Sequence, residues 1–262
     1  MDYLLISIIS FGTALLTFFS GFGLGTILMP VFAIFFPVEI AIALSAVVHF
    51  ANNIFKIGLV WKHINYKILV SFALPAMGFA FLGAFALNYL TDSVILYQYH
   101  IGSKLFDITL IKLIISILLI IFSIIEIDKR FEKITFEKKT LPIGGALSGF
   151  FGGLSGHQGA LRSMFLLRIG LSKESFVATG IATAILIDIS RLTVYGTSFL
   201  FKHFSTVNND KSVLFIIVAC LGAFIGTYFG QKLLKKITMR TVQIIVGLMI
   251  LTFAILLGFG II

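Results

Sequence analysis

The chain has 262 residues, of which 59% are hydrophobic and 12% are charged. Soluble proteins carry about 25% charged residues, and a mean hydropathy of +1.09 is too high for a water-exposed surface. The composition excludes a soluble enzyme, a disordered protein and, with the single Cys220, a small disulfide scaffold. A transmembrane β-barrel alternates apolar and polar residues, whereas residues 113–125 are apolar on every side. We therefore expect an all-α polytopic membrane protein.

The net charge of +9 does not indicate nucleic-acid binding, although phosphate backbones attract basic proteins. The lysines and arginines lie in short clusters between apolar segments. This pattern is typical of the cytoplasmic loops of membrane proteins. The expected partners are therefore a lipid bilayer and a small solute, and no nucleic acid.

Apolar segments of membrane-spanning length follow one another along the whole chain, and their short separators leave no room for a soluble domain. A helix needs about 20 apolar residues to cross a bilayer. The segments cover 3–36, 39–60, 68–91, 105–127, 142–168, 174–201, 211–231 and 241–262.

Two of these segments are interrupted by glycine. Residues 20–25 interrupt the first segment, and residues 152–159 interrupt the fifth. Glycine weakens the interior of a helix, and broken backbone at membrane depth must be buried in protein or line a cavity. Both segments are therefore predicted to be pairs of short helices.

The basic clusters assign the sides of the membrane. The residues placed inside are Lys62 and Lys67, then Lys129, Arg130, Lys133, Lys138 and Lys139, then Arg168 and Lys173, and finally Lys232, Lys235, Lys236 and Arg240. Asp2, Glu39 and the loops 91–104 and 202–211 are poorer in basic residues and are placed outside. Segment 142–168 then begins and ends on the inside, so we expect it to be re-entrant. Segment 3–36 is expected to do the same from outside, while the other six segments cross and both termini face outside.

The two halves resemble each other at a constant offset. Ser20-Gly21 falls on Ser155-Gly156, Asn53 on Asp188 and Lys56 on Arg191, and Leu-Gly-Ala-Phe occurs at both 82–85 and 221–224. Because the aligned loops fall on opposite sides, the prediction is an inverted repeat, as in many secondary transporters. It comprises a first repeat at 1–127, a cytoplasmic linker at 128–140 and a second repeat at 141–262. The alternative is a duplicated bundle with no role in transport.

Ionisable residues inside the apolar segments are the candidates for function, because burying charge in a membrane is costly. His49, Asn52, Asn53 and Lys56 recur at helical spacing and share one face of segment 39–60. Asp188 and Arg191 occupy the matching part of segment 174–201. Arg162 follows the second glycine break, which itself contains His157 and Gln158.

This set of residues is suited to binding an anion. Helix N-termini favour negative charge, and one is expected after Gly25 and another after Gly159. Arginine offers planar, bidentate donors for oxyanions. The predicted substrate-binding residues are Ser20, Gly21, Gly25, Asn52, Asn53, Lys56, Ser155, Gly156, His157, Gln158, Arg162 and Arg191. Histidine titrates near neutral pH, and the predicted proton-coupling residues are His49, His157 and Asp188.

Structural alternatives stay open for several of these residues. Lys56 could extend to the inner surface, as could Arg162, and Asp188 and Arg191 could form a purely structural pair. His49 could be a packing residue. Gly222, Gly226 and Gly230 predict close helix packing. His63, His100 and His203 lack the spacing of metal ligands, so neither a metal nor another cofactor is expected.

The glycine motifs resemble those of the sulfite exporter TauE/SafE family of membrane permeases. The likeness is carried by Ser20–Gly25 continuing to Pro30, by Gly149–Gly159, by Ala178-Thr179 and by the Leu-Gly-Ala-Phe repeats, and it covers nearly the whole chain. It implies a bacterial inner-membrane transporter of small sulfur-containing anions. The sequence departs from the family pattern at Phe22 and Leu24, which separate glycines that are usually consecutive, and at His157-Gln158, where small residues are usual.

The prediction is a multi-pass, proton-coupled secondary transporter of a sulfur-containing oxyanion such as sulfite or an organosulfonate. It works by alternating access, and a homodimer is among the expectations. The alternative is a passive anion channel. An enzyme is not expected, since no nucleophile–base pair or metal cluster stands out. A scaffold would have little reason to carry intramembrane charge.

Overall fold

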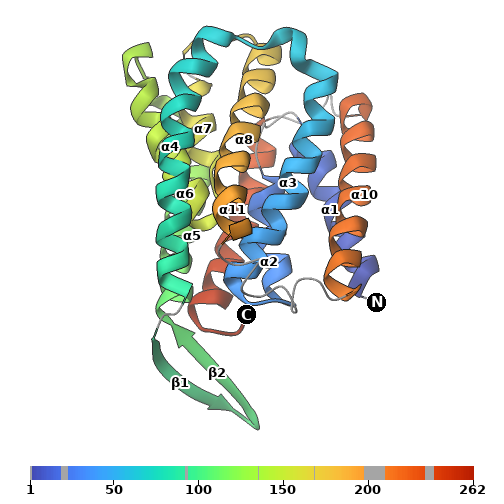
Figure 1. Ribbon diagram of the computed structural model, residues 1–262, viewed down its shortest axis with the longest axis vertical. Helices are drawn as coiled ribbons and strands as arrows, with labels where there is room; N and C mark the ends of the chain where they lie inside the picture. Colours follow the sequence, from blue (N-terminus) through green and yellow to red (C-terminus); the bar gives the residue numbers. More distant parts are fainter. Residues whose placement is uncertain are drawn as a thin grey trace.

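The computed structural model describes residues 2–18, 23–91, 94–134, 136–167, 169–197, 210–233 and 239–262 (Figure 1). Predictions for Ser20, Gly21, Arg168, Lys202, His203, Lys235 and Lys236 lie outside these residues. Within them, six helices are long and apolar enough to cross a membrane. These are α3 (Val38–Val60), α4 (Tyr66–Thr91), α5 (Leu110–Ile127), α8 (Lys173–Tyr195), α10 (Asp210–Leu233) and α11 (Met239–Gly258). The predicted six crossing segments and the polytopic helical fold are confirmed.

Both interrupted segments are pairs of short helices, as predicted. The first contains α1 (Asp2–Thr17) and α2 (Leu24–Ala33), and the second contains α6 (Leu141–Ser155) and α7 (Gly159–Leu166). Gly23 precedes α2 with a φ of 113°, and Gly156 ends α6 with a φ of 80°. Only glycine adopts this left-handed region readily, which explains why the chain turns at these positions.

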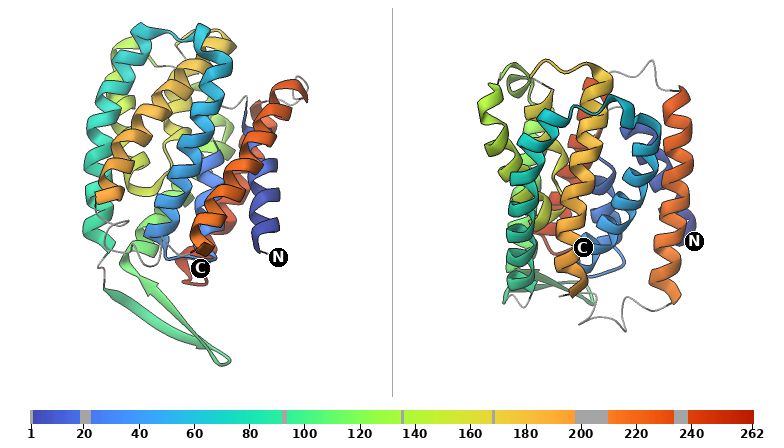
Figure 2. Two further views of the ribbon diagram at one scale, coloured as in Figure 1. Left: turned by 45° about the vertical axis from the view of Figure 1, so that its right-hand side comes forward. Right: turned by 45° about the horizontal axis from the view of Figure 1, so that its top comes forward.

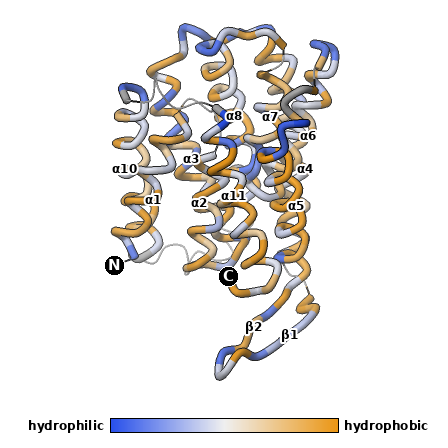
Figure 3. The backbone as a smooth tube through the Cα atoms, turned by 180° about the vertical axis from the view of Figure 1, so that it is seen from behind, coloured by the Kyte–Doolittle hydropathy of each residue, from blue (hydrophilic) through white to orange (hydrophobic). Residues whose placement is uncertain are grey.

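The two pairs point into the bundle from opposite ends. The N-terminus, the C-terminus and the start of α1 lie at one end, which we call the terminal end (Figures 1 and 2). Helices α6 and α7 meet the chain at the other end, where the loops between α3 and α4 and between α5 and α6 lie. This second end carries Lys62, Lys129, Arg130, Lys138 and Lys139, and we call it the basic end (Figure 3). It is the end predicted to face the cytoplasm.

Glycines bring α6 directly onto α4, and α10 directly onto α1. Helices in a membrane associate mainly through close van der Waals packing, which small residues permit. In α6, Gly145, Gly149 and Gly153 lie against the main chain of Phe72, Ala76 and Ala80. In α10, Gly222, Gly226 and Gly230 lie against the main chain of Ser7, Phe11 and Leu15. The packing role expected for the α10 glycines is confirmed, whereas the inverted repeat itself stays a prediction.

A β-hairpin protrudes from the terminal end (Figure 1). Strands β1 (Ile95–Ile101) and β2 (Lys104–Thr109) pair antiparallel, with Tyr99 opposite Phe106. The prediction of a helical segment from residue 105 was wrong, because α5 begins only at Leu110. The Thr109 hydroxyl caps α5 by accepting a hydrogen bond from the Lys112 amide at 3.3 Å, which ends the strand and starts the helix.

Short 3₁₀ turns close the loops at the basic end. They are η1 (Trp61–His63), η2 (Lys129–Lys133) and η3 (Lys138–Thr140). Around the centre, apolar side chains of α2, α3, α5 and α11 form one continuous core, which includes Ile42, Leu119 and Val246. This core surrounds the polar residues described next.

Candidate functional site

A buried polar network joins α3, α8 and the break between α6 and α7. At its centre is the carboxylate of Asp188. His49 Nδ1 lies 2.7 Å from Asp188 Oδ2, and Gln158 Nε2 donates to Asp188 Oδ1 at 2.9 Å. Arg162 NH1 in turn donates to Gln158 Oε1 at 3.0 Å. The structure therefore brings together His49, Gln158, Arg162, Asp188 and Arg191, all of which sequence reasoning selected.

Asp188 and Arg191 form a salt bridge with both side chains 0% exposed. The Arg191 Nε and NH2 groups donate to Asp188 Oδ1 at 2.9 and 2.7 Å, and NH1 donates to the Gly152 main-chain oxygen at 3.3 Å. The i,i+3 spacing on α8 places the two groups on one face. In this conformation the guanidinium is thus occupied by protein acceptors.

Arg162 is 1% exposed, so its side chain does not extend to the surface. Helix α7 carries it into the bundle beside Gly180 of α8, where an added Cβ would lie 3.7 Å from Arg162 Nε. The absence of a side chain at Gly180 gives the guanidinium room. Arg162 therefore approaches the network from the second arm of the re-entrant pair.

Lys56 is buried as well, with 4% of its surface exposed. Its Nζ lies 5.8 Å from the centroid of the Phe18 ring, an arrangement that allows a cation–π interaction. Among the described residues, no carboxylate forms an ion pair with it. The expected alternative, extension to the inner surface, is not what the structure shows.

The charges in this region do not balance. Lys56, Arg162 and Arg191 are three buried cations, and Asp188 is the one buried carboxylate beside them in the described part of the chain. A buried charge is costly unless it is paired. The excess positive charge in this region is what an anionic ligand would neutralise.

The remaining predicted residues divide between the network and other contacts. Asn53 Nδ2 lies 3.2 Å from the ring nitrogens of His49, and Gly25 of α2 packs against the same ring. Asn52 instead faces α10, where its Oδ1 accepts a hydrogen bond from Thr227 Oγ1 at 2.8 Å. Asn52 is thus separated from the network that includes its neighbour Asn53.

His157 and Ser155 make local contacts within the second break. His157 Nδ1 lies 2.6 Å from the Ser155 main-chain oxygen, and the ring stacks on Phe122 of α5 with 6.1 Å between centroids. The imidazole also interacts with the main chain of Thr26, in the first turn of α2. Ser155 Oγ donates back to Phe151 within α6 at 2.9 Å. His157 therefore connects the two breaks.

Both expected helix N-termini are present. Helix α7 begins at Gly159 as predicted, and α2 begins at Leu24, slightly before the predicted start. Neither has a side-chain cap hydrogen bond. The amides of a first helical turn have no partner within the helix, so both ends retain the donors that favour an anion.

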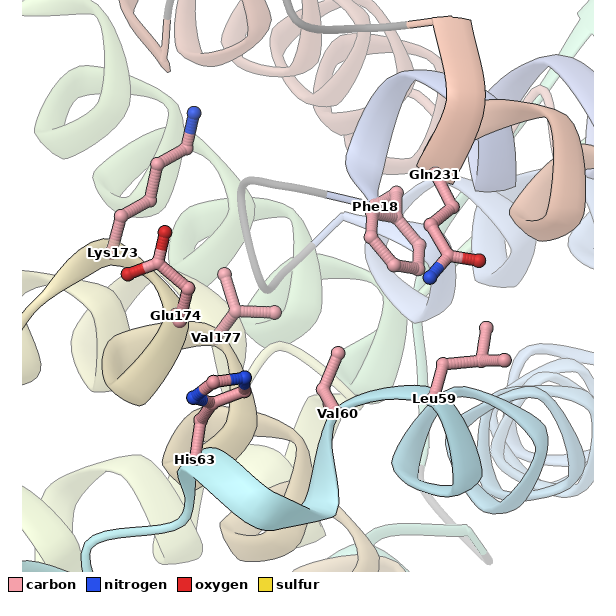
Figure 4. A pocket seen from close by; sticks show the side chains of 8 residues that line it. All are labelled: Phe18, Leu59, Val60, His63, Lys173, Glu174, Val177 and Gln231. Atoms are coloured by element: carbon pink, nitrogen blue, oxygen red, sulfur yellow. The ribbon is translucent and has the colours of Figure 1, made fainter.

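Sequence reasoning missed a cavity of about 390 Å³ at the basic end (Figure 4). Its lining comes from α3, η1, α8, α10 and the residue that follows α1, and comprises Phe18, Leu59, Val60, His63, Lys173, Glu174, Val177 and Gln231. None of the predicted binding residues lines it. Phe18 links the two regions, because the same ring lies against Lys56.

Tyr195 was also missed, although it lies one helical turn after Arg191. Its hydroxyl donates to the Gly153 main-chain oxygen of α6 and interacts with Arg191. The i,i+4 spacing on α8 was the available signal. Tyr195 helps to hold α6 against α8, beside the ion pair.

Six spanning helices, two short helix pairs and buried charge at their meeting point define a multi-pass membrane protein of the transporter class. The chain belongs to the sulfite exporter TauE/SafE family, whose model matches residues 6–257. Membership implies a membrane exporter of sulfite or a related anion, and transport rather than catalysis. No curated protein and no solved structure matches the chain. The expected homodimer receives no support from these comparisons.

Proposed function

We propose that the protein is a proton-coupled secondary transporter that moves sulfite or a small organosulfonate across the bacterial inner membrane by alternating access. The observation that carries this proposal is the buried, carboxylate-free ammonium of Lys56 next to a cavity. Family membership supplies the substrate class. The two short helix pairs, each packed on a long helix through glycines, support the predicted inverted repeat.

The cavity provides the route from the basic end. Val60 and Leu59 line it, and Lys56 lies one turn earlier on the same helix. Lys173, His63 and Gln231 give the wall groups that can donate hydrogen bonds to an anion (Figure 4). With about 390 Å³ the cavity has room for a small hydrated anion. This geometry supports a conformation that is open to the basic end.

The substrate would bind beyond Phe18, between Lys56, Arg162 and the first turns of α2 and α7. Lys56 supplies a point charge and Arg162 a planar donor, while the uncapped amides add partial positive charge. The predicted Ser20 and Gly21 belong to the same proposed site. His49 and Asp188 are the proposed proton-coupling pair, because protonating either changes the charge that Arg191 and Arg162 experience.

Accumulation against a gradient tests this proposal. Purified protein in liposomes is expected to accumulate radiolabelled sulfite when a pH gradient is imposed, and not in protein-free liposomes. Sulfate, thiosulfate and a short organosulfonate serve as competitors to define the substrate. Flux that only equilibrates sulfite would identify a passive channel. No flux of any sulfur anion in either direction would overturn the proposal.

The orientation can be tested separately. Single cysteines at Ser103 in the hairpin and at Lys138 at the basic end, in a Cys220→Ser background, are expected to react with an impermeant thiol reagent from opposite sides. Labelling of both from the same side would contradict the proposed topology.

A further inference from the structure

Glu126 is a buried carboxylate that lies outside the network around Asp188. It belongs to the last turn of α5 and is 3% exposed. Within the described part of the chain, its carboxylate makes no hydrogen bond and no ion pair. Ionised carboxylates in such surroundings are costly. The position therefore needs an explanation.

A small crevice adjoins this carboxylate. Its lining comes from α5, η2, α7 and α11 and comprises Ile125, Glu126, Phe131, Ala160, Ser163, Met164, Leu167 and Gln243. Its volume of about 20 Å³ matches a single water molecule, which needs roughly 10–15 Å³ and two to four polar partners. Glu126, Ser163 and Gln243 are the three polar side chains in this lining.

Ser163 gives an independent indication that the crevice holds something. Its side chain is 3% exposed, and its Oγ is buried without a hydrogen-bond partner among the described residues. Buried hydroxyls are nearly always satisfied. A protonated Glu126 carboxyl, reaching Ser163 directly or through one water, would satisfy both groups.

The charged groups around Glu126 leave this role open to a proton. Arg240 of α11 attracts the carboxylate, but its guanidinium donates to the main-chain oxygens of Glu126, at 3.1 Å, and of Ile127. In η2, Arg130 pairs with Asp128 at 2.7 Å, and its hydrogen bonds lower the pKa of the Asp128 carboxyl. On α7, Arg162 is directed to Gln158.

We infer that Glu126 binds a proton at the basic end and, through Ser163, transmits its protonation state to α7. Helix α7 has eight residues and carries Ser163 next to Arg162, so one short helix contacts both the proton site and the proposed anion site. Deprotonation would leave an unpaired charge in the crevice, and α7 would have to shift to admit water. This role rests on the proposed function and adds a residue to its coupling mechanism.

The same crevice is closed toward the membrane centre. Phe122, one turn earlier on α5, packs with Ala160 and Leu161 of α7. The face of Phe122 also stacks on His157. The proton site at Glu126 therefore communicates with the basic end, while an aromatic ring separates it from the histidine in the break.

Glu126→Gln mimics the neutral carboxyl and tests the inference. In liposomes we expect this variant to keep sulfite–sulfite exchange within about twofold while losing accumulation driven by a pH gradient by about tenfold or more. Glu126→Asp should retain part of the driven accumulation. Glu137→Gln, which removes an exposed carboxylate at the same end, is the matched control and should behave as wild type. Driven accumulation by Glu126→Gln equal to wild type would overturn the inference.

A substrate-independent measurement separates this inference from the proposed function. The infrared C=O band of a protonated carboxyl should be present in wild-type protein at neutral pH, kept in Glu137→Gln and lost in Glu126→Gln. If wild type moved no anion but the band disappeared in Glu126→Gln, the proton site would stand and the transport proposal would fall. An unchanged band in Glu126→Gln would overturn the proton site.

Discussion

Lys56 of α3 and Arg191 of α8 are buried cations with different neighbours. Arg191 has Asp188 three residues earlier and donates to it through two nitrogens. The residue three positions before Lys56 is Asn53, which is neutral and contacts His49 instead. The first cation is paired by the protein, while the second lies against an aromatic ring next to a cavity.

This difference separates a structural charge from one available to a ligand. Both residues fall on each other in the predicted repeat, and both are near the end of a spanning helix. A paired buried charge is costly to disrupt, whereas an unpaired one destabilises the protein until a ligand arrives. The predictions below test whether the two positions differ in this way.

The largest expected effect is on stability, from Asp188→Asn. This change removes the charge that Arg191, His49 and Gln158 contact, and breaking a buried pair costs about 3–5 kcal/mol. We expect a strongly lowered midpoint of thermal unfolding in detergent, measured by intrinsic fluorescence. The double variant Asp188→Leu with Arg191→Met should recover much of the loss, since it leaves no charge unpaired. An Asp188→Asn protein as stable as wild type would show that Arg191 does not depend on this pair.

The glycine contacts are expected to be equivalent in the two halves, unlike the charges. Gly149→Val would press a side chain onto the main chain of Ala76, and Gly226→Val onto that of Phe11. Overpacking costs about 1–3 kcal/mol, so both variants should unfold at lower temperature. Gly78→Val on α4 is the control, because no atom lies within 4 Å of a Cβ there. A clear loss in only one of the two halves would argue against equivalent packing.

The sequence predicted the spans and the re-entrant pairs because their signals are local. Basic residues at 138–139 and at Lys173 had to share one side, so the segment between them could not cross. Hydropathy gave the six spanning helices, and the glycines marked the turns at Gly23 and Gly156. The hairpin was missed because the alternation in β2, over six residues, merged with the apolar segment that follows.

Contacts between helices were less predictable. Helical spacing placed His49 and Asn52 on one face, but the rotation of α3 directs His49 to Asp188 and Asn52 to Thr227 of α10. Glu126 was overlooked because it lies at the end of an apolar segment, where a charge usually faces solvent. Such relations depend on neighbours distant in sequence, which no local pattern encodes.

Lys56→Met sharpens the comparison from the other side. Removing an unpaired buried charge should leave the unfolding midpoint unchanged or raised, while sulfite transport in liposomes falls by about tenfold or more, about 1.4 kcal/mol in binding free energy. Lys56→Arg should retain part of the activity. Lys62→Met, which changes a lysine in the exposed turn η1, is the control and should transport as wild type does. Normal transport by Lys56→Met would remove Lys56 from the proposed site.

The smallest expected effect concerns Asn52, which the structure separates from the network. Thr227→Val deletes the donor to Asn52 Oδ1 and keeps the shape of the side chain, so we expect a loss of about 1 kcal/mol in stability. Sulfite transport should stay within about twofold of wild type, because the change reaches neither Lys56 nor Asp188, and additivity holds for sites without shared partners. If Thr227→Val instead abolished transport at nearly unchanged stability, Asn52 would belong to the binding site. The division between a paired α8 charge and a ligand-binding α3 charge would then have to include the contact of α3 with α10.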